Sequence, residues 1–155
     1  MNKRVLYIIL CFSLFAGAQN QEVNWLSFEE LEQGLLREPK KVLIYFNADW
    51  CVYCKKMDQS TFTDNEVNSI LENNYYAVKF NVESSDTIYF GGKRFVNSEV
   101  GKRRNPIHDI PKLLAGRPTK TIELPALIFL DETFEIKKRF YSYIPPKNMV
   151  SILKE

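Results

Sequence analysis

Cysteine and histidine are scarce in this chain of 155 residues, which has three cysteines and one histidine. A structural zinc site takes four ligands, mostly cysteine and histidine. Once Cys11 is lost with the N-terminal segment described below, only three such residues remain, which argues against a zinc site. Three cysteines are also too few for the dense disulfide framework of a small secreted scaffold. An excess of one charge is lacking too, because 21 basic side chains face 19 acidic ones. The balance indicates no basic stripe for nucleic acid, which is therefore not an expected partner.

Long apolar runs are lacking except at the N-terminus, where "VLYIILCFSLF" is too short to span a membrane comfortably. Lys3 and Arg4 precede this run, and the small residues "AGA" follow it. This pattern predicts a secretory signal peptide, residues 1–18, with an uncleaved anchor as the alternative. The mature domain is then 19–155, periplasmic or secreted, and it meets the membrane only through the signal peptide during export.

Removal of the predicted signal peptide changes the totals. The remaining 137 residues (155 less 18) suit a single domain with one core. Lys3 and Arg4 are lost with the signal, so 19 basic side chains balance 19 acidic ones. Cys11 is lost as well, which leaves Cys51 and Cys54 as the only cysteines. Two cysteines so close together close a very small loop and constrain little of the unfolded chain, so they make a poor structural staple.

Helix-capping signals and apolar runs predict an α/β domain with a mixed sheet between helices. Ser27 and Glu30 form a capping box before a helix that ends near Pro39, and Thr63 with Glu66 repeats this signature. Further helices are expected after Cys51, over 106–116 and over 145–155; strands are expected over 41–46, 76–82, 124–131 and 134–143.

The segment from about 83 to 120 looks like an insertion. Gly91 and Gly92 separate two short β-like runs, which predicts a two-residue hairpin turn. A short helix over 106–116 then ends at Gly116, with Pro111 in its first turn. Such an insertion either selects partners or is a solvated decoration of the surface, which is the default expectation.

Cys51 follows the buried-strand candidate directly and opens the next helix, in "NADWCVYCKK". The free N–H groups of a helix N-terminus favour the thiolate, which is the reactive form. Cys54 lies one turn further on the same face, so the pair suits thiol–disulfide exchange. A Cu(I) site formed by both thiols and His108 is the alternative. His108 otherwise reads as a surface residue or the start of a helix.

The run "YFNADWCVYCKKMDQSTFTDNEV" resembles the active-site segment of secreted thioredoxin-like proteins. The most similar motif is that of the C-terminal thioredoxin-like domain of the disulfide reductase DsbD. The resemblance extends through "YAVKFNVE" and "ELPALIFLDE" to the last helix, and covers about residues 25–155 apart from the insertion. It implies a thioredoxin fold whose hairpin-plus-helix insertion precedes the cis-proline strand.

The resemblance also implies roles for individual residues. Cys51 would be the nucleophile and Cys54 the resolving thiol. Trp50 would shield the pair from one side, although its position also suits an ordinary core aromatic. Lys79 would lie near the active site, or else be a solvated residue of a strand end.

A proline before the apolar strand completes the family pattern. Pro125 would be the cis-proline facing the disulfide, and Leu124 would offer backbone groups to an extended substrate segment. One family feature is missing, because the buried aspartate six residues before the first cysteine is replaced by Tyr45. Either Asp49, Glu83 or water would then take the proton-shuttle role of this aspartate, or the cysteine pair would exchange disulfides less efficiently.

The function expected from these features is thiol–disulfide exchange with protein partners of the cell envelope. The protein would act as a reductant, with a disulfide isomerase or oxidant, or a copper carrier, as alternatives. No cofactor is expected beyond the redox-active Cys51–Cys54 disulfide. The resemblance implies protein thiols and disulfides as partners, and an unidentified upstream electron donor.

Overall fold

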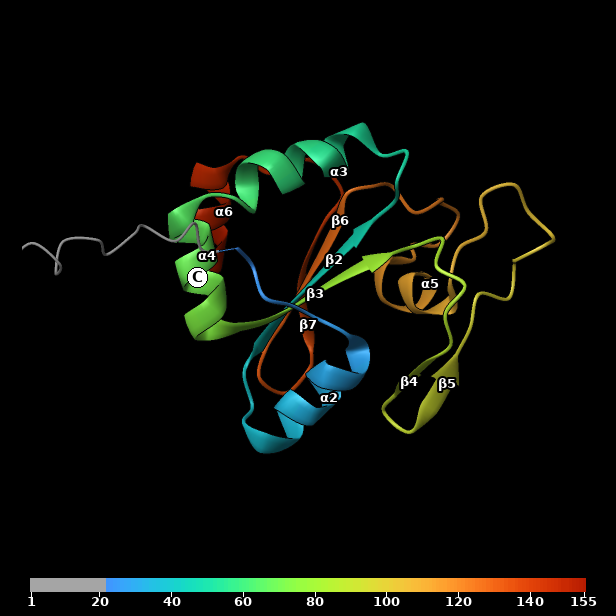
Figure 1. Cartoon of the computed structure of the whole chain (residues 1–155), viewed down its shortest axis with the longest axis horizontal. Helices are drawn as coiled ribbons and strands as arrows, with labels where there is room; N and C mark the ends of the chain where they lie inside the picture. Colours follow the sequence, from blue (N-terminus) through green and yellow to red (C-terminus); the bar gives the residue numbers. More distant parts are fainter. Residues whose placement is uncertain (1–21) are drawn as a thin grey trace, which may run out of the picture.

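A computed structural model of the chain describes residues 22–155 (Figure 1). The predicted signal peptide, residues 1–18, lies outside the described residues and stays a prediction. Within the described part, no helix has the length and apolar character needed to cross a membrane.

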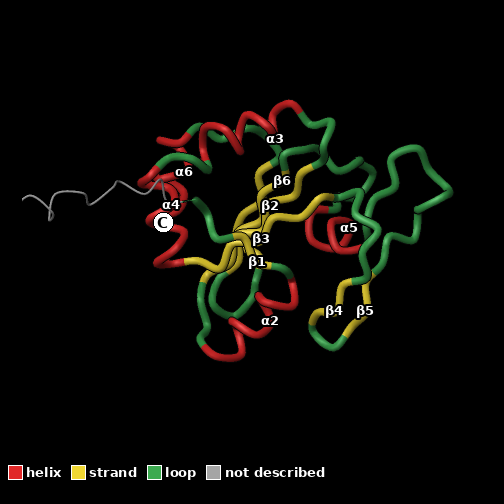
Figure 2. The backbone as a smooth tube through the Cα atoms, in the orientation of Figure 1, coloured by secondary structure: helices red, strands yellow, loops and turns green. Residues whose placement is uncertain are grey.

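A central five-stranded sheet runs through the molecule in the order β1-β3-β2-β6-β7 (Figure 2). The first three strands in this order are parallel to one another, whereas β6 is antiparallel to β2 and to β7. The predicted mixed sheet is therefore confirmed. The strands are β1 Trp25–Leu26, β2 Lys41–Asn47, β3 Tyr75–Asn81, β6 Ala126–Leu130 and β7 Ile136–Phe140. Sequence patterning missed β1, because a strand of two residues shows no periodicity.

Helices cover both faces of the sheet. Three of them, α3, α4 and α6, gather on one side, and α2 and α5 lie on the other (Figure 1). A π-helical turn, η1, continues α3. The bounds are α2 Phe28–Arg37, α3 Val52–Lys56, η1 Met57–Thr61, α4 Asn65–Asn74, α5 Asp109–Ala115 and α6 Pro146–Leu153.

The core is centred on β2 and β6. Val42–Phe46 and all of β6 are buried, which explains why both strands are continuous apolar runs rather than alternating ones. Because this central pair of strands is buried on both faces, the positions of the strand ends are well defined. The segment that follows β2 and the segment that precedes β6 contain the candidate site residues.

The predicted start of α2 is confirmed, and that of α4 is one residue off. Ser27 Oγ accepts the Glu30 N–H at 3.1 Å, and a Glu30 carboxylate oxygen accepts the Ser27 N–H at 2.7 Å. The cap of α4 is Asp64 rather than Thr63, because the Asp64 carboxylate accepts the two amides of Glu66 and Val67. The Thr63 hydroxyl points back and donates to carbonyl oxygens of the preceding turn.

The insertion contains the predicted hairpin and helix. Strands β4 Ile88–Phe90 and β5 Lys93–Phe95 form a separate antiparallel pair. Gly91 and Gly92 join them with φ angles of 60° and 69°, which glycine adopts without steric cost. The hairpin is held against α2, since Glu29 and Glu32 accept N–H groups of the β4 strand and its turn.

The inserted helix α5 ends at Gly116 as predicted, but it begins at Asp109, three residues after the predicted start. Pro111 sits in its first turn, where no intrahelical N–H is needed, and Gly116 is its C-cap. A β-carbon at Gly116 would lie 2.1 Å from the Lys112 carbonyl oxygen, so the close approach of the chain requires glycine here.

Candidate active site

The cysteine pair lies at the edge of the sheet where β2 ends. Phe46, near the end of β2, pairs with Ala126, the first residue of β6. Since β6 runs antiparallel to β2, this register brings the Leu124–Pro125 segment to the same edge as the loop that leads to Cys51. The Leu124–Pro125 peptide bond is cis, as the resemblance implied.

Cys51 and Cys54 form a disulfide with their Cα atoms 5.2 Å apart. Cys51 is the N-cap of α3, and its sulfur accepts the Cys54 N–H at 3.1 Å. The helix start that was predicted at Cys51 is thus confirmed. An amide donor aimed at the Cys51 sulfur stabilises negative charge there when the disulfide is reduced.

Trp50 does not belong to the core, so its interpretation as an ordinary core aromatic is wrong. Its side chain is 55% exposed, and its indole N–H donates to the Glu83 carboxylate at 3.0 Å. Val52 and Tyr53, between the two cysteines, are exposed as well. Cys51 itself is 4% exposed. The side chains of Trp50, Val52 and Tyr53 thus form an exposed apolar rim around Cys51, which is itself almost completely buried.

Tyr45 lies beneath the pair, in the position where the family has an aspartate. Its side chain is fully buried, and its hydroxyl donates to the Cys54 carbonyl oxygen at 3.1 Å. Burial, followed by the negative charge of Asp58, raises the pKa of Tyr45 above its ordinary value. The phenol therefore stays protonated at neutral pH and acts as a hydrogen-bond donor rather than a base.

Lys79 is tied to this cluster through a carboxylate that sequence reasoning missed. Its ammonium group contacts Asp58 at 2.8 Å and lies 5.7 Å from the centre of the Tyr45 ring. Asp58 follows Cys54 by four residues, about one helical turn. This spacing is the sequence feature that could have indicated a carboxylate on the same side of the helical segment as Cys54. Lys79 is therefore a partner of Asp58 rather than a freely solvated residue.

The two carboxylates that the sequence suggested as proton acceptors, Asp49 and Glu83, both accept hydrogen bonds from other side chains. Asp49 accepts a hydrogen bond from the Asn81 amide at 3.1 Å, and Glu83 holds Trp50. Asp58 is the carboxylate whose charge acts on Tyr45. Asp58, rather than Asp49 or Glu83, is therefore the carboxylate near Tyr45, whose hydroxyl bonds to the Cys54 carbonyl oxygen.

His108 starts helix α5, as expected, but it is fully buried rather than on the surface. Its Nδ1 accepts the Ile110 N–H at 3.2 Å, so Nε2 donates to the Asp86 carbonyl oxygen at 3.1 Å. Burial lowers the pKa of His108. Because both ring nitrogens are engaged, the copper alternative loses its third ligand. Residues 22–155 contain no cluster of three side chains suited to a metal ion.

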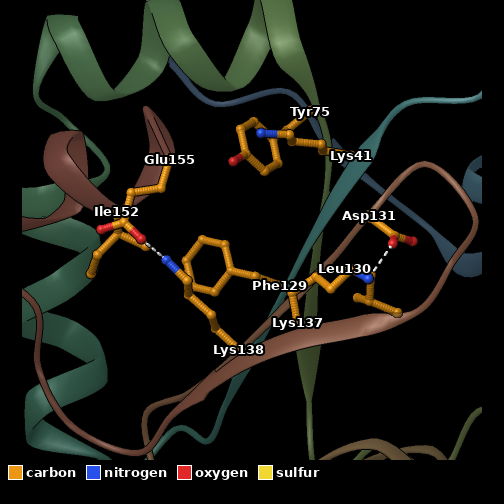
Figure 3. A pocket seen from close by; sticks show the side chains of 9 residues that line it. All are labelled: Lys41, Tyr75, Phe129, Leu130, Asp131, Lys137, Lys138, Ile152 and Glu155. Carbon is orange, nitrogen blue, oxygen red and sulfur yellow. Dashed lines mark hydrogen bonds and ion pairs between the residues drawn. The ribbon is translucent and has the colours of Figure 1, made fainter.

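A cavity of about 360 Å³ lies at the opposite end of the sheet, next to the first residue of β2 and the last of β6 (Figure 3). Phe129 and Ile152 contribute apolar surface to it. On its rim Lys138 pairs with Glu155, and Lys137 pairs with Asp131. Its charges are thus largely compensated internally, and it is remote from the cysteines.

The thioredoxin-like domain family matches residues 30–155, and the chain belongs to this family. Curated relatives named thiol:disulfide interchange protein DsbD share about a third of the aligned residues. The protein from Campylobacter jejuni (strain RM1221) is 32% identical over an alignment of 109 residues, and the match covers 56% of this chain and 19% of the relative. The one from Vibrio vulnificus is 32% identical over 120 residues, 74% and 16% respectively. The chain therefore spans less than a fifth of the length of these relatives.

Solved structures of low sequence identity share the thioredoxin fold. A thioredoxin from Thermus thermophilus has a TM-score of 0.58 at 18% identity and covers 86% of this chain and 85% of its own. A structure titled DsbH Oxidoreductase has a TM-score of 0.56 at 19% identity, with 86% and 83% covered. The reduced C-terminal domain of DsbD from Neisseria meningitidis has a TM-score of 0.52 at 13% identity, with 81% and 90% covered. The predicted thioredoxin fold is confirmed.

Proposed function

We propose that this protein is a thiol–disulfide oxidoreductase of the cell envelope that reduces disulfides of partner proteins. The observation that carries the proposal is the Cys51–Cys54 disulfide, whose first sulfur caps helix α3 at the edge of the sheet where β2 ends. No group beyond this disulfide is needed for the chemistry.

The exchange consists of two sulfur displacements. In the reduced protein, the Cys51 thiolate attacks one sulfur of the partner disulfide, a mixed disulfide forms and the other partner sulfur leaves as a thiolate. The Cys54 thiolate then attacks Cys51, which releases the second partner sulfur and leaves Cys51–Cys54 oxidised. Two electrons thus pass to the partner disulfide. An upstream donor protein with a dithiol then reduces the Cys51–Cys54 disulfide again.

The residues around the pair have distinct roles in this proposal. The backbone of Leu124, beside the cis peptide bond to Pro125, pairs with an extended partner segment as an added strand. Trp50, fixed by Glu83, covers one side of the reacting sulfurs. Asp58 and Lys79 form an ion pair beside Tyr45, the residue that bonds to the Cys54 carbonyl oxygen.

The choice of a reductant over an oxidant rests on the similarity to relatives named thiol:disulfide interchange protein DsbD. Reduction potentials of thioredoxin-fold proteins span about −270 to −120 mV, so an oxidant or isomerase on the same fold differs from a reductant by up to about 7 kcal/mol. The residues between the cysteines, Val52 and Tyr53, and the amide bonded to Cys51 set the value within this range. The predicted signal peptide supports a periplasmic or secreted location.

Trapping of mixed disulfides tests this function. A Cys54→Ser variant of the full chain, expressed in its native host, retains the attacking thiol and lacks the resolving one. We expect it to accumulate covalent complexes with envelope proteins that disappear on treatment with dithiothreitol. A Cys51→Ser variant is the matched control and is expected to trap far less. Equal trapping by both variants, or none by either, contradicts the proposal.

A further inference from the structure

Charge is strongly segregated along this chain, although its total is nearly balanced. Residues 93–120 contain eight lysines and arginines and only two acidic residues, Glu99 and Asp109. Residues 22–92 contain twelve acidic and six basic residues, and residues 121–155 contain five of each. The segment 93–120, termed the cationic lobe below, thus has a formal charge of +6, opposite to the −6 of residues 22–92. The balanced net charge of the chain therefore conceals one strongly basic segment.

Few charges of the cationic lobe are neutralised. Glu99 pairs with Arg103 and Lys112, and Asp109 pairs with Lys112. Arg117 contacts Glu123, just beyond the lobe. The other five basic side chains form no ion pair with a carboxylate of residues 22–155; they are Lys93, Arg94, Lys102, Arg104 and Lys120. All five are exposed.

The cationic lobe is anchored beside the disulfide. Ten residues before its first residue, Glu83 binds Trp50, the neighbour of Cys51. The N–H of His108 donates to the Val82 carbonyl oxygen at 2.8 Å. The N–H of Val82 in turn donates to the carbonyl oxygen of Asn47, the last residue of β2. Beyond the lobe the chain continues to Leu124. The loop between β5 and α5 projects from the side of the molecule where β2 and β3 end and α3 begins (Figure 1).

The loop that carries Lys102 and Arg104 is held in a defined shape. The Asn97 amide donates to the carbonyl oxygens of Ser84 and Pro106, which clamps the two ends of the loop together. Glu99 accepts the Ile107 N–H at 3.0 Å. A preorganised set of like charges gives more directional steering than a flexible tail, since no ordering is needed on contact.

We propose that the cationic lobe docks an acidic surface of the partner protein whose disulfide reacts with Cys51. The inference rests on the proposed function, because it concerns the partner of that same site. Attraction between the lobe and the partner raises the rate of encounter and orients the partner disulfide towards Cys51. A compact acidic patch suits the lobe better than a membrane or a long nucleic acid does, because an extended polyanion also meets the acidic remainder of the chain.

Disulfide peptides of different charge test the proposal. Three synthetic peptides of equal length contain one internal disulfide flanked by four Glu, four Gln or four Lys residues. The second-order rate of their reduction by the reduced mature protein is measured at about 20 mM and about 500 mM salt. We expect the Glu peptide to react about tenfold faster than the Gln peptide at low salt, and this ratio to fall towards one at high salt.

Charge-matched variants assign the effect to the lobe. The Lys102→Gln/Arg104→Gln variant removes two unpaired lobe charges and is expected to lower the Glu-to-Gln rate ratio about threefold or more. The Arg37→Gln/Lys40→Gln variant removes two charges before the start of β2, at the opposite end of this strand from Cys51, and is expected to leave the ratio unchanged.

The outcomes separate the two proposals. A ratio that is the same in the lobe variant as in the wild type overturns the docking proposal, while reduction of the Gln peptide upholds the proposed function. If no peptide is reduced, both fail. Sedimentation with phosphatidylglycerol vesicles that is lost in the lobe variant, without any peptide preference, assigns the lobe to a lipid surface and also overturns the proposal.

Discussion

The hydroxyl of Tyr45 donates a 3.1 Å hydrogen bond to the carbonyl oxygen of Cys54, and both residues are buried. This bond joins the central strand of the sheet to the helical segment that carries the disulfide. Tyr45 therefore acts as a buried structural hydrogen-bond donor to the helical segment that carries the cysteines.

Tyr45→Phe is expected to destabilise the oxidised protein by about 1–3 kcal/mol, because it leaves the buried Cys54 carbonyl oxygen without its donor. Urea unfolding measures this loss. Tyr143→Phe is the matched control, since the Tyr143 hydroxyl contacts Ser60 at 3.3 Å in a partly buried setting. A loss at Tyr143 as large as that at Tyr45 contradicts the role assigned to Tyr45.

The ion pair between Asp58 and Lys79 is expected to contribute modestly to stability. Both side chains are about 30% exposed, so solvent screens their attraction. A double-mutant cycle with Asp58→Asn and Lys79→Gln should give a coupling energy of about 0.3–1 kcal/mol in urea unfolding. A coupling energy near zero would show that the two charges are independent in solution.

His108 makes folding stability depend on pH below neutrality. Burial lowers its pKa in the folded state, whereas the unfolded residue keeps a value of about 6.5. The stabilisation that neutral His108 gives the folded state is therefore fully present above about pH 6.5. It is lost as the pH falls below this value, because the unfolded state then binds the proton more readily than the folded state does. The urea midpoint of the wild type should fall more between pH 7.5 and 5 than that of His108→Asn, whose amide can cap α5 without titrating. Parallel pH profiles for the two proteins would refute this.

In the reduced protein, Cys51 should react with iodoacetamide before Cys54 does. The helix N-terminus and the Cys54 N–H favour the Cys51 thiolate, while Cys54 lies deeper, above Tyr45. Quenching at intervals, followed by peptide mass spectrometry, gives the rate at each site. Faster alkylation of Cys54 would reverse the roles of the two thiols.

The main features of this fold were readable because they rest on local chemistry. The Cys51–Cys54 spacing, the glycines of the hairpin turn and the capping box of Ser27 each depend on a few neighbouring residues. The cis form of the Leu124–Pro125 bond could be expected only from the family resemblance, because cis is uncommon even before proline.

The features that the sequence did not reveal depend on contacts between distant segments. The link between Asp58 and Lys79 joins residues 21 positions apart, and the burial of His108 results from packing against Phe80 and hydrogen bonding to Asp86. The N-cap of α4 is Asp64 rather than the predicted Thr63, because the threonine hydroxyl donates to the preceding turn instead. Sequence spacing alone does not encode these competing contacts.

A redox titration of the mature protein tests the central claim most directly. The protein is equilibrated in thiol–disulfide buffers of graded potential, its free thiols are alkylated and the mass is recorded. We predict a reversible two-electron transition of Cys51 and Cys54 with a midpoint between about −270 and −120 mV. A pair that stays oxidised in buffers poised below about −300 mV would be a structural disulfide, and this result would contradict the proposed function.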